Sequence, residues 1–124
     1  MARVLVVDDE RGLRVLVGMV LKSIGCEMVE AADGVEALDI LRDDPAFDLV
    51  ITDVHMARMD GVRFLTVLRE QYPTLPVILS SVDFRLDRVS QVIQQGAAAY
   101  LPRPFTPRQL IEVVERVMDK RAHR

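Results

Sequence analysis

The stretch Arg3-Val-Leu-Val-Val-Asp-Asp9 (RVLVVDD) decides the fold of this chain. Val4–Val7 is a short run of branched apolar side chains, typical of a buried strand, and two carboxylates follow it directly. Three more apolar runs end in polar groups: Leu49–Thr52 at Asp53, Val77–Leu79 at Ser80 and Ser81, and Tyr100–Leu101 near Arg103. If these runs are parallel strands, their carboxyl ends meet at the sheet edge where open α/β sheets bind ligands. The pattern therefore predicts a crevice with three carboxylates, a hydroxyl and a cation.

Segments with helical periodicity separate the apolar runs. Helices are predicted over residues 11–24, after the capping-box-like Asp33-Gly-Val-Glu36, after Asp60-Gly61, over about 86–95, and after Thr106-Pro107. The predicted strands are Arg3–Val7, Glu27–Ala31, Phe47–Thr52, Leu75–Ser80 and Ala98–Leu101. Five such βα units with short connections predict an α/β fold, a doubly wound parallel sheet with helices on both faces. The first, third and fourth strands are almost wholly apolar, as central strands should be.

Length and composition set the frame for function. The 124 residues suit one domain, assigned to residues 1–120, with residues 121–124 as a C-terminal tail or the start of a linker. A net charge of −3 argues against nucleic-acid binding by this domain alone. No apolar run approaches the roughly 18 residues of a membrane span, so no membrane association is expected. Cys26 is the only cysteine and no export signal is recognisable, so a cytoplasmic location is expected.

Five short motifs occur in a fixed order: Leu5-Val-Val-Asp-Asp9, Asp48-Leu-Val-Ile-Thr-Asp53, Met59-Asp-Gly61, Pro76-Val-Ile-Leu79 and Arg103-Pro-Phe105. In this order and spacing the chain resembles the receiver domains of two-component response regulators (CheY-like) over residues 2–119. The resemblance implies a flavodoxin-like fold with strand order 2-1-3-4-5. It also implies a signalling domain that accepts a phosphoryl group and is not itself an enzyme.

The residue types at the predicted crevice indicate metal-assisted phosphoryl chemistry. Asp53 is the candidate nucleophile and phosphoacceptor, since a carboxylate can attack a phosphoryl group. Asp8 and Asp9 beside it would raise its pKa by repulsion, and a hard cation such as Mg2+ (or Mn2+) with oxygen ligands would relieve this. The resemblance implies Asp9, Asp53 and the backbone carbonyl of His55 as direct ligands, with Asp8 acting through water. The alternative is that Asp8 and Asp9 only cap the first helix.

The resemblance assigns further roles around the acceptor. Ser81 lies 22 residues before Arg103, the family spacing for the hydroxyl that contacts the phosphoryl group, although strand-end serines usually make local turn bonds. Tyr100 matches the aromatic switch residue, and its alternative is a half-buried tyrosine with a solvated hydroxyl. His55 and Asp83 match positions that tune dephosphorylation. The bond between Arg103 and Pro104 matches a cis-proline peptide.

Three positions depart from the family pattern. Arg103 replaces a lysine; its planar fork could neutralise phosphoryl oxygens or lock onto Asp53 as a bidentate pair. Val82 stands where a small residue is usual and could narrow donor access, and Ala57 replaces a proline, which should loosen the loop after Asp53. Two interpretations follow: a phosphorylatable receiver, or a pseudo-receiver that serves as a phosphorylation-independent interaction module.

The resemblance also implies partners. The phosphoryl donor would be a sensor histidine kinase or a phosphotransfer protein. An effector domain or protein would dock on the face formed by helix 86–95, strand 98–101 and the last helix, and a homodimer is left open. Enzyme alternatives fit poorly: a flavodoxin needs a hydroxyl- and glycine-rich loop after the first strand, a haloacid-dehalogenase-type phosphatase needs an acid where His55 stands, and a dinucleotide fold needs Gly-x-Gly-x-x-Gly.

Overall fold

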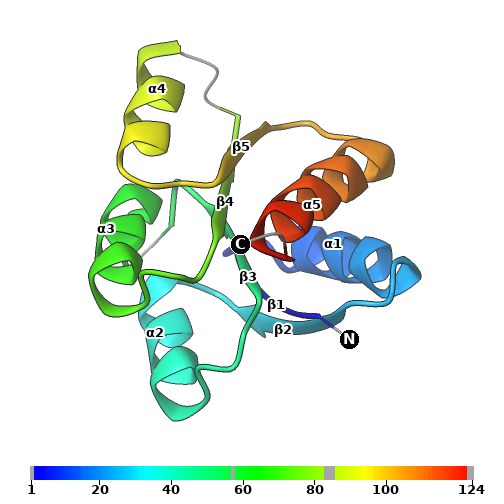
Figure 1. The fold of residues 1–124 in the computed structure, drawn as a ribbon, viewed down its shortest axis with the longest axis horizontal. Helices are drawn as coiled ribbons and strands as arrows, with labels where there is room; N and C mark the ends of the chain where they lie inside the picture. Colours follow the sequence, from blue (N-terminus) through cyan, green and yellow to red (C-terminus); the bar gives the residue numbers. More distant parts are fainter. Residues whose placement is uncertain (1, 57, 83–85, 123–124) are drawn as a thin grey trace.

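Five parallel strands form the centre of the molecule, in the order β2-β1-β3-β4-β5 (Figure 1). The computed structural model describes residues 2–56, 58–82 and 86–122. The strands are β1 (Arg3–Val7), β2 (Glu27–Ala31), β3 (Leu49–Asp53), β4 (Val77–Ser81) and β5 (Ala99–Pro102). Every residue of β3 and β4 is buried, which is why these strands are almost continuously apolar. The predicted doubly wound sheet is confirmed.

Five helices cover the two faces of the sheet. They are α1 (Arg11–Ser23), α2 (Gly34–Asp43), α3 (Gly61–Gln71), α4 (Leu86–Gln94) and α5 (Pro107–Ala122). Figure 1 shows α1 and α5 together on one face, with α2, α3 and α4 on the other. Two apolar clusters fill the layers, one with Phe64 of α3 and Val92 of α4, the other with Leu21 of α1 and Leu110 of α5. Alternate residues of each strand enter opposite clusters, as the pleat requires.

Three strands lie closer to the carboxyl edge than predicted. Their predicted ranges were Phe47–Thr52, Leu75–Ser80 and Ala98–Leu101, whereas the observed strands end at Asp53, Ser81 and Pro102. Phe47 is buried like a strand residue, but its N–H donates to the carbonyl of Pro45 in a local turn. Phe47 therefore precedes β3, and the predicted start of this strand was too early. As a consequence Asp53 is a member of β3, paired in register with Ser80 of β4.

The helix starts follow the predicted capping residues. The Asp33 carboxylate accepts from the N–H of Glu36 at 2.9 Å, and that of Asp60 accepts from the N–H of Val62 at 2.7 Å. Thr106 and Gln109 exchange reciprocal side-chain to backbone bonds at the start of α5. The last helix continues through Ala122, into the predicted tail. No helix in the described part of the chain has the length and apolar character needed to cross a membrane.

Candidate functional site

Three carboxylates meet at the carboxyl edge of the central strands. Asp8 and Asp9 follow β1, Asp53 ends β3, and one oxygen from each lies within 4.8 Å of the others. Asp8 and Asp53 are buried while Asp9 is exposed, so the cluster opens to solvent on one side. Oxygen donors at this spacing suit a hard divalent cation such as Mg2+, which takes one or two carboxylates and retains water ligands.

Backbone contacts hold Asp8 at the end of the sheet. Its N–H donates to the carbonyl of Ala31 at 3.1 Å, and its Oδ1 accepts from the N–H of Glu10 at 2.8 Å. Glu10, rather than Asp8 or Asp9, is the N-cap residue of α1, and its side chain makes no capping bond. The alternative in which Asp8 and Asp9 only cap the first helix therefore has no support from the described contacts.

Burial dominates the electrostatics of Asp53. Loss of solvent raises the pKa of its carboxyl, and nearby Asp8 raises it further. Arg103 and the N–H of His55, which donates to Asp53 Oδ1 at 3.3 Å, oppose this rise without cancelling it. The anion that would act as nucleophile is therefore held at a cost, which additional positive charge in the crevice would reduce.

Arg103 contacts both buried carboxylates but favours Asp8. Its Nη2 lies 2.5 Å from Asp8 Oδ2, whereas its Nη1 lies 3.7 Å from Asp53 Oδ2. The predicted lock of the guanidinium onto Asp53 as a bidentate pair is wrong in this structure. The Nε atom of Arg103 donates to the hydroxyl of Ser80 at 3.1 Å. This hydrogen bond accounts for the orientation of the guanidinium toward Asp8 after β1. Arg103 thus binds one edge of the carboxylate cluster.

Ser80 is a site residue that the sequence placed at the strand end but did not select, since the spacing favoured Ser81. Its side chain lines a small hollow with Asp8, Asp53 and Arg103, on the α1 and α5 side of the sheet. Ser81, the residue chosen by spacing, is buried, and its carbonyl accepts from the N–H of Arg103 at 2.9 Å. Successive strand residues point to opposite faces, so the two hydroxyls serve different sides of the sheet. The signal that could have found Ser80 is its position directly opposite Asp53 in the parallel register.

The structure describes four of the other predicted residues, His55, Tyr100, Val82 and Pro104. His55 is exposed at the rim, and its N–H already contacts Asp53. Tyr100 is half-buried and packs against the apolar core between the sheet and α2, α3 and α4. The bond between Arg103 and Pro104 is a cis peptide. Asp83 and Ala57 lie outside the described residues, and Val82 is 65% exposed, so its side chain extends into solvent beside the crevice.

Gly61 fixes the backbone beside Asp53. Its N–H donates to the carbonyl of Val54 at 2.7 Å. A Cβ atom at this position would lie 2.6 Å from Val54 Cα and closer still to the carbonyl oxygen of Asp53. Since real Cβ atoms do not approach backbone so closely, only glycine lets α3 start directly against the end of β3. The predicted helix start at Asp60-Gly61 is therefore also a support for Asp53.

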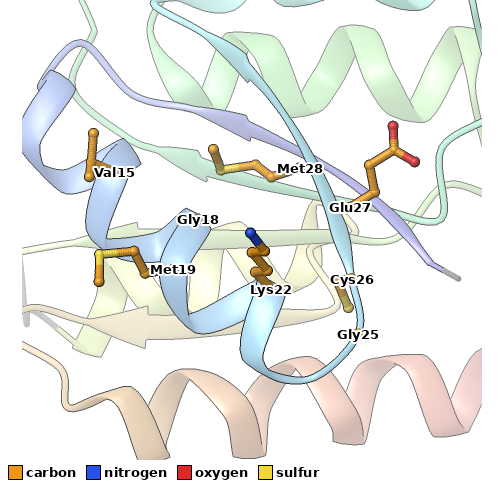
Figure 2. Close-up of a pocket in the computed structure, with 8 residues that line it drawn as sticks. All are labelled: Val15, Gly18, Met19, Lys22, Gly25, Cys26, Glu27 and Met28. Atoms are coloured by element: carbon orange, nitrogen blue, oxygen red, sulfur yellow. The ribbon is translucent and has the colours of Figure 1, made fainter.

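A wider groove lies away from this cluster, between α1 and the edge strand β2 (Figure 2). It has a volume of about 530 Å³ and is lined by Val15, Gly18, Met19, Lys22, Gly25, Cys26, Glu27 and Met28. Burial raises the pKa of the Cys26 thiol, which favours its neutral form. The groove has one cationic and one anionic side chain among apolar neighbours. It therefore lacks the converging polar groups of the carboxylate crevice.

Comparison with known proteins identifies the family. Residues 4–115 match the response regulator receiver domain family. The chain is 42% identical to response regulator protein FleR of Pseudomonas aeruginosa over 115 residues, which are 93% of this chain and 24% of that protein. It is 36% identical to transcriptional regulatory protein CpxR of Escherichia coli over 123 residues, 99% of this chain and 51% of that protein. The chain thus spans about a quarter of the length of FleR and about half of the length of CpxR.

Solved structures agree with this assignment. NtrX from Brucella abortus superposes with a TM-score of 0.91 at 34% identity, covering 98% of this chain and 28% of that chain. Chemotaxis protein CheY4 of Vibrio cholerae superposes with a TM-score of 0.88 at 34% identity, covering 94% and 98%. The chain belongs to the response regulator receiver domain family and is a signalling domain of the two-component type.

Proposed function

We propose that Asp53 is the phosphoacceptor of this receiver domain. The observation that carries the proposal is the meeting of three carboxylates and one arginine at the end of the central strands. An Asp53 oxygen attacks the phosphorus of the donor, a P–O bond forms, and the bond between phosphorus and the donor's leaving group breaks. The product is an acyl phosphate on a domain that receives the group and is not itself an enzyme.

The carboxylate cluster supports Mg2+ (or Mn2+) as the cofactor. Asp9, Asp53 and the backbone carbonyl of His55 would be direct ligands, and Asp8 would act through water. When bound, the ion supplies positive charge against the incoming phosphoryl oxygens. Arg103 neutralises the remaining charge, while Ser81 and Tyr100 respond to the modified aspartate. His55 and Asp83 tune the lifetime of the acyl phosphate from the rim.

The proposed partners follow from the family. A sensor histidine kinase or phosphotransfer protein in the cytoplasm donates the phosphoryl group. An effector domain or protein reads the change, in keeping with the similarity to CpxR, a transcriptional regulatory protein of which this chain covers 51%. The docking face would include β5 and α5, where Tyr100, Pro102, Gln109 and Val113 help to line a hollow of about 250 Å³. Neither nucleic-acid nor membrane binding by this domain is proposed, and a second copy is the other candidate for this face.

The test is intact-protein mass measurement after incubation with a small acyl phosphate or phosphoramidate donor and Mg2+. We expect one added phosphoryl group on the wild-type protein, none on Asp53→Asn, and none when a chelator replaces Mg2+. Asp43→Asn is the matched control, because it removes an exposed aspartate on α2, and it should be modified like the wild type. No adduct on the wild-type protein at long times would favour the pseudo-receiver, with Arg103 held on Asp8.

A further inference from the structure

We propose that Arg58 and Asp33 form a clamp that positions the loop after Asp53 for metal binding. The described parts of this loop, residues 54–56 and 58–60, include His55, whose backbone N–H donates to Asp53 Oδ1. Arg58 donates to Asp33 through Nε at 2.7 Å and through Nη2 at 3.1 Å, a bidentate pair that joins this loop to the start of α2. The proposal rests on the metal site proposed above.

The Asp33 side of the clamp is rigid. Its side chain is only 11% exposed, and the same carboxylate caps α2 by accepting from the N–H of Glu36. A side chain held by a helix start and by burial loses little further freedom when it binds a second group. Glu36 and Asp39 of α2 add negative potential at the guanidinium. The Asp33 carboxylate is therefore held in position independently of Arg58.

Apolar contacts align the loop with the same helix start. Gly34 is buried against Met59, so close that a Cβ atom on Gly34 would lie 3.2 Å from the Met59 Cβ and Sδ atoms. Met56 packs against the core on the same side of the sheet. The two methionines set how closely the loop packs against the core. The directional hydrogen bonds of the Arg58 guanidinium set where the loop lies relative to the start of α2. The His55 backbone lies between the end of β3 and the first of these anchors, Met56.

The effect on metal binding follows from this geometry. If the loop drifts, the His55 carbonyl no longer holds a fixed position relative to Asp53, and the preorganisation of that ligand is lost. Arg58 is 58% exposed, so solvent screens the pair and limits the expected effect to about threefold to fivefold. Arg58 is thus a positioning residue that acts through the loop, not a group that touches phosphate.

The test compares Arg58→Ala, Arg58→Lys and Asp33→Asn with the wild type. Asparagine can still cap α2, so Asp33→Asn breaks the clamp while keeping the helix start. Arg42→Ala is the matched control, since it removes another exposed arginine that pairs with α2 aspartates away from the loop. Two quantities are measured: hydrogen exchange of the His55 amide in metal-free protein, and Mg2+ affinity by calorimetry.

We expect exchange at His55 about threefold to fivefold faster, and Mg2+ binding weaker by a similar factor, in Arg58→Ala and Asp33→Asn. Arg58→Lys should fall between these variants and the wild type, and Arg42→Ala should match the wild type. Unchanged exchange, or faster exchange with unchanged Mg2+ affinity, would overturn the positioning role. Equal weakening in Arg42→Ala would also overturn it by assigning the effect to net charge. A wild-type protein that binds no Mg2+ would instead refute the metal site, and His55 exchange would still decide whether the clamp holds the loop.

Discussion

The crevice and the clamp each set an arginine against an aspartate, with opposite results. In the crevice, burial raises the pKa of Asp53 although Arg103 lies 3.7 Å away. In the clamp, two hydrogen bonds from Arg58 lower the pKa of Asp33, and they outweigh the smaller effect of burial. The difference shows that a nearby cation does not determine the state of a carboxylate by itself. Contact distance and access to solvent decide which effect is larger.

The two pKa shifts have opposite consequences for stability. A raised pKa in the folded state means that ionised Asp53 opposes folding, so its contribution worsens as the pH rises from aspartate's ordinary value through the raised pKa. A lowered pKa means that Asp33 stabilises the fold above its ordinary value, and this is lost as the pH falls through the lowered pKa. The partners of Asp53 in the crevice therefore do not offset its burial, and a cation could do so, whereas hydrogen bonds from Arg58 already stabilise the charge of Asp33 in the clamp.

The largest expected effect comes from breaking the crevice pair with Arg103→Ala. In the proposed site the Arg103 guanidinium would compete with Mg2+ for Asp8. Removing the guanidinium should therefore tighten Mg2+ binding by about tenfold, the equivalent of about 1.4 kcal/mol. Phosphorylation should nevertheless slow by about tenfold or more, because a cation facing the phosphoryl oxygens is lost. Calorimetric titration and the time course of adduct mass measure the two effects.

Arg103→Lys is the matched control for that variant. Lysine keeps the charge but cannot span Asp8, Ser80 and Asp53 at once, so Mg2+ affinity should lie between the wild type and Arg103→Ala. Phosphorylation should be retained. If Arg103→Ala binds Mg2+ no more tightly than the wild type, the guanidinium does not compete with the metal for Asp8. The crevice would then not differ from the clamp in having a charge that a metal ion can relieve.

A smaller effect is expected on the clamp side, from Asp33→Ala. This change removes both the partner of Arg58 and the cap of α2, and it should lower the free energy of unfolding by about 1 kcal/mol. Asp33→Asn keeps the cap and should lose clearly less. Asp60→Ala is the control, because Asp60 caps α3 without an arginine contact among the described pairs. Denaturant unfolding measures all three, and an equal loss in Asp33→Asn and Asp33→Ala would show that the ion pair, not the cap, carries the stability.

Much of the crevice was predictable from the sequence, because its acids directly follow short apolar strands. Asp8, Asp9 and Asp53 could be placed together from strand order alone, since parallel strands end at one edge. Ser80 was set aside in favour of Ser81 because a count along the chain does not report which face a strand residue occupies. The register opposite Asp53 and the alternation of the pleat settle that in the structure.

The arginine contacts were not predictable in the same way. Arg103 has a long side chain, and its choice of Asp8 over Asp53 depends on the hydroxyl of Ser80 bonding its Nε. The clamp joins Arg58, in the loop before α3, to Asp33, 25 positions earlier at the start of α2. No local sequence pattern predicts such a contact. The sequence did indicate that Asp33 caps a helix, but the second function of that carboxylate depends on tertiary structure.

The most direct test of the account is a residue-specific titration of the aspartate carboxyl groups by carbon NMR, with and without Mg2+. Without the metal, Asp53 should titrate above the ordinary range of aspartate and Asp33 below it. Saturating Mg2+ should lower the midpoint of Asp53 and leave that of Asp33 unchanged, because the proposed metal site includes Asp53 and not Asp33. An Asp53 midpoint that Mg2+ does not move, or one that starts at or below that of Asp33, would contradict the account.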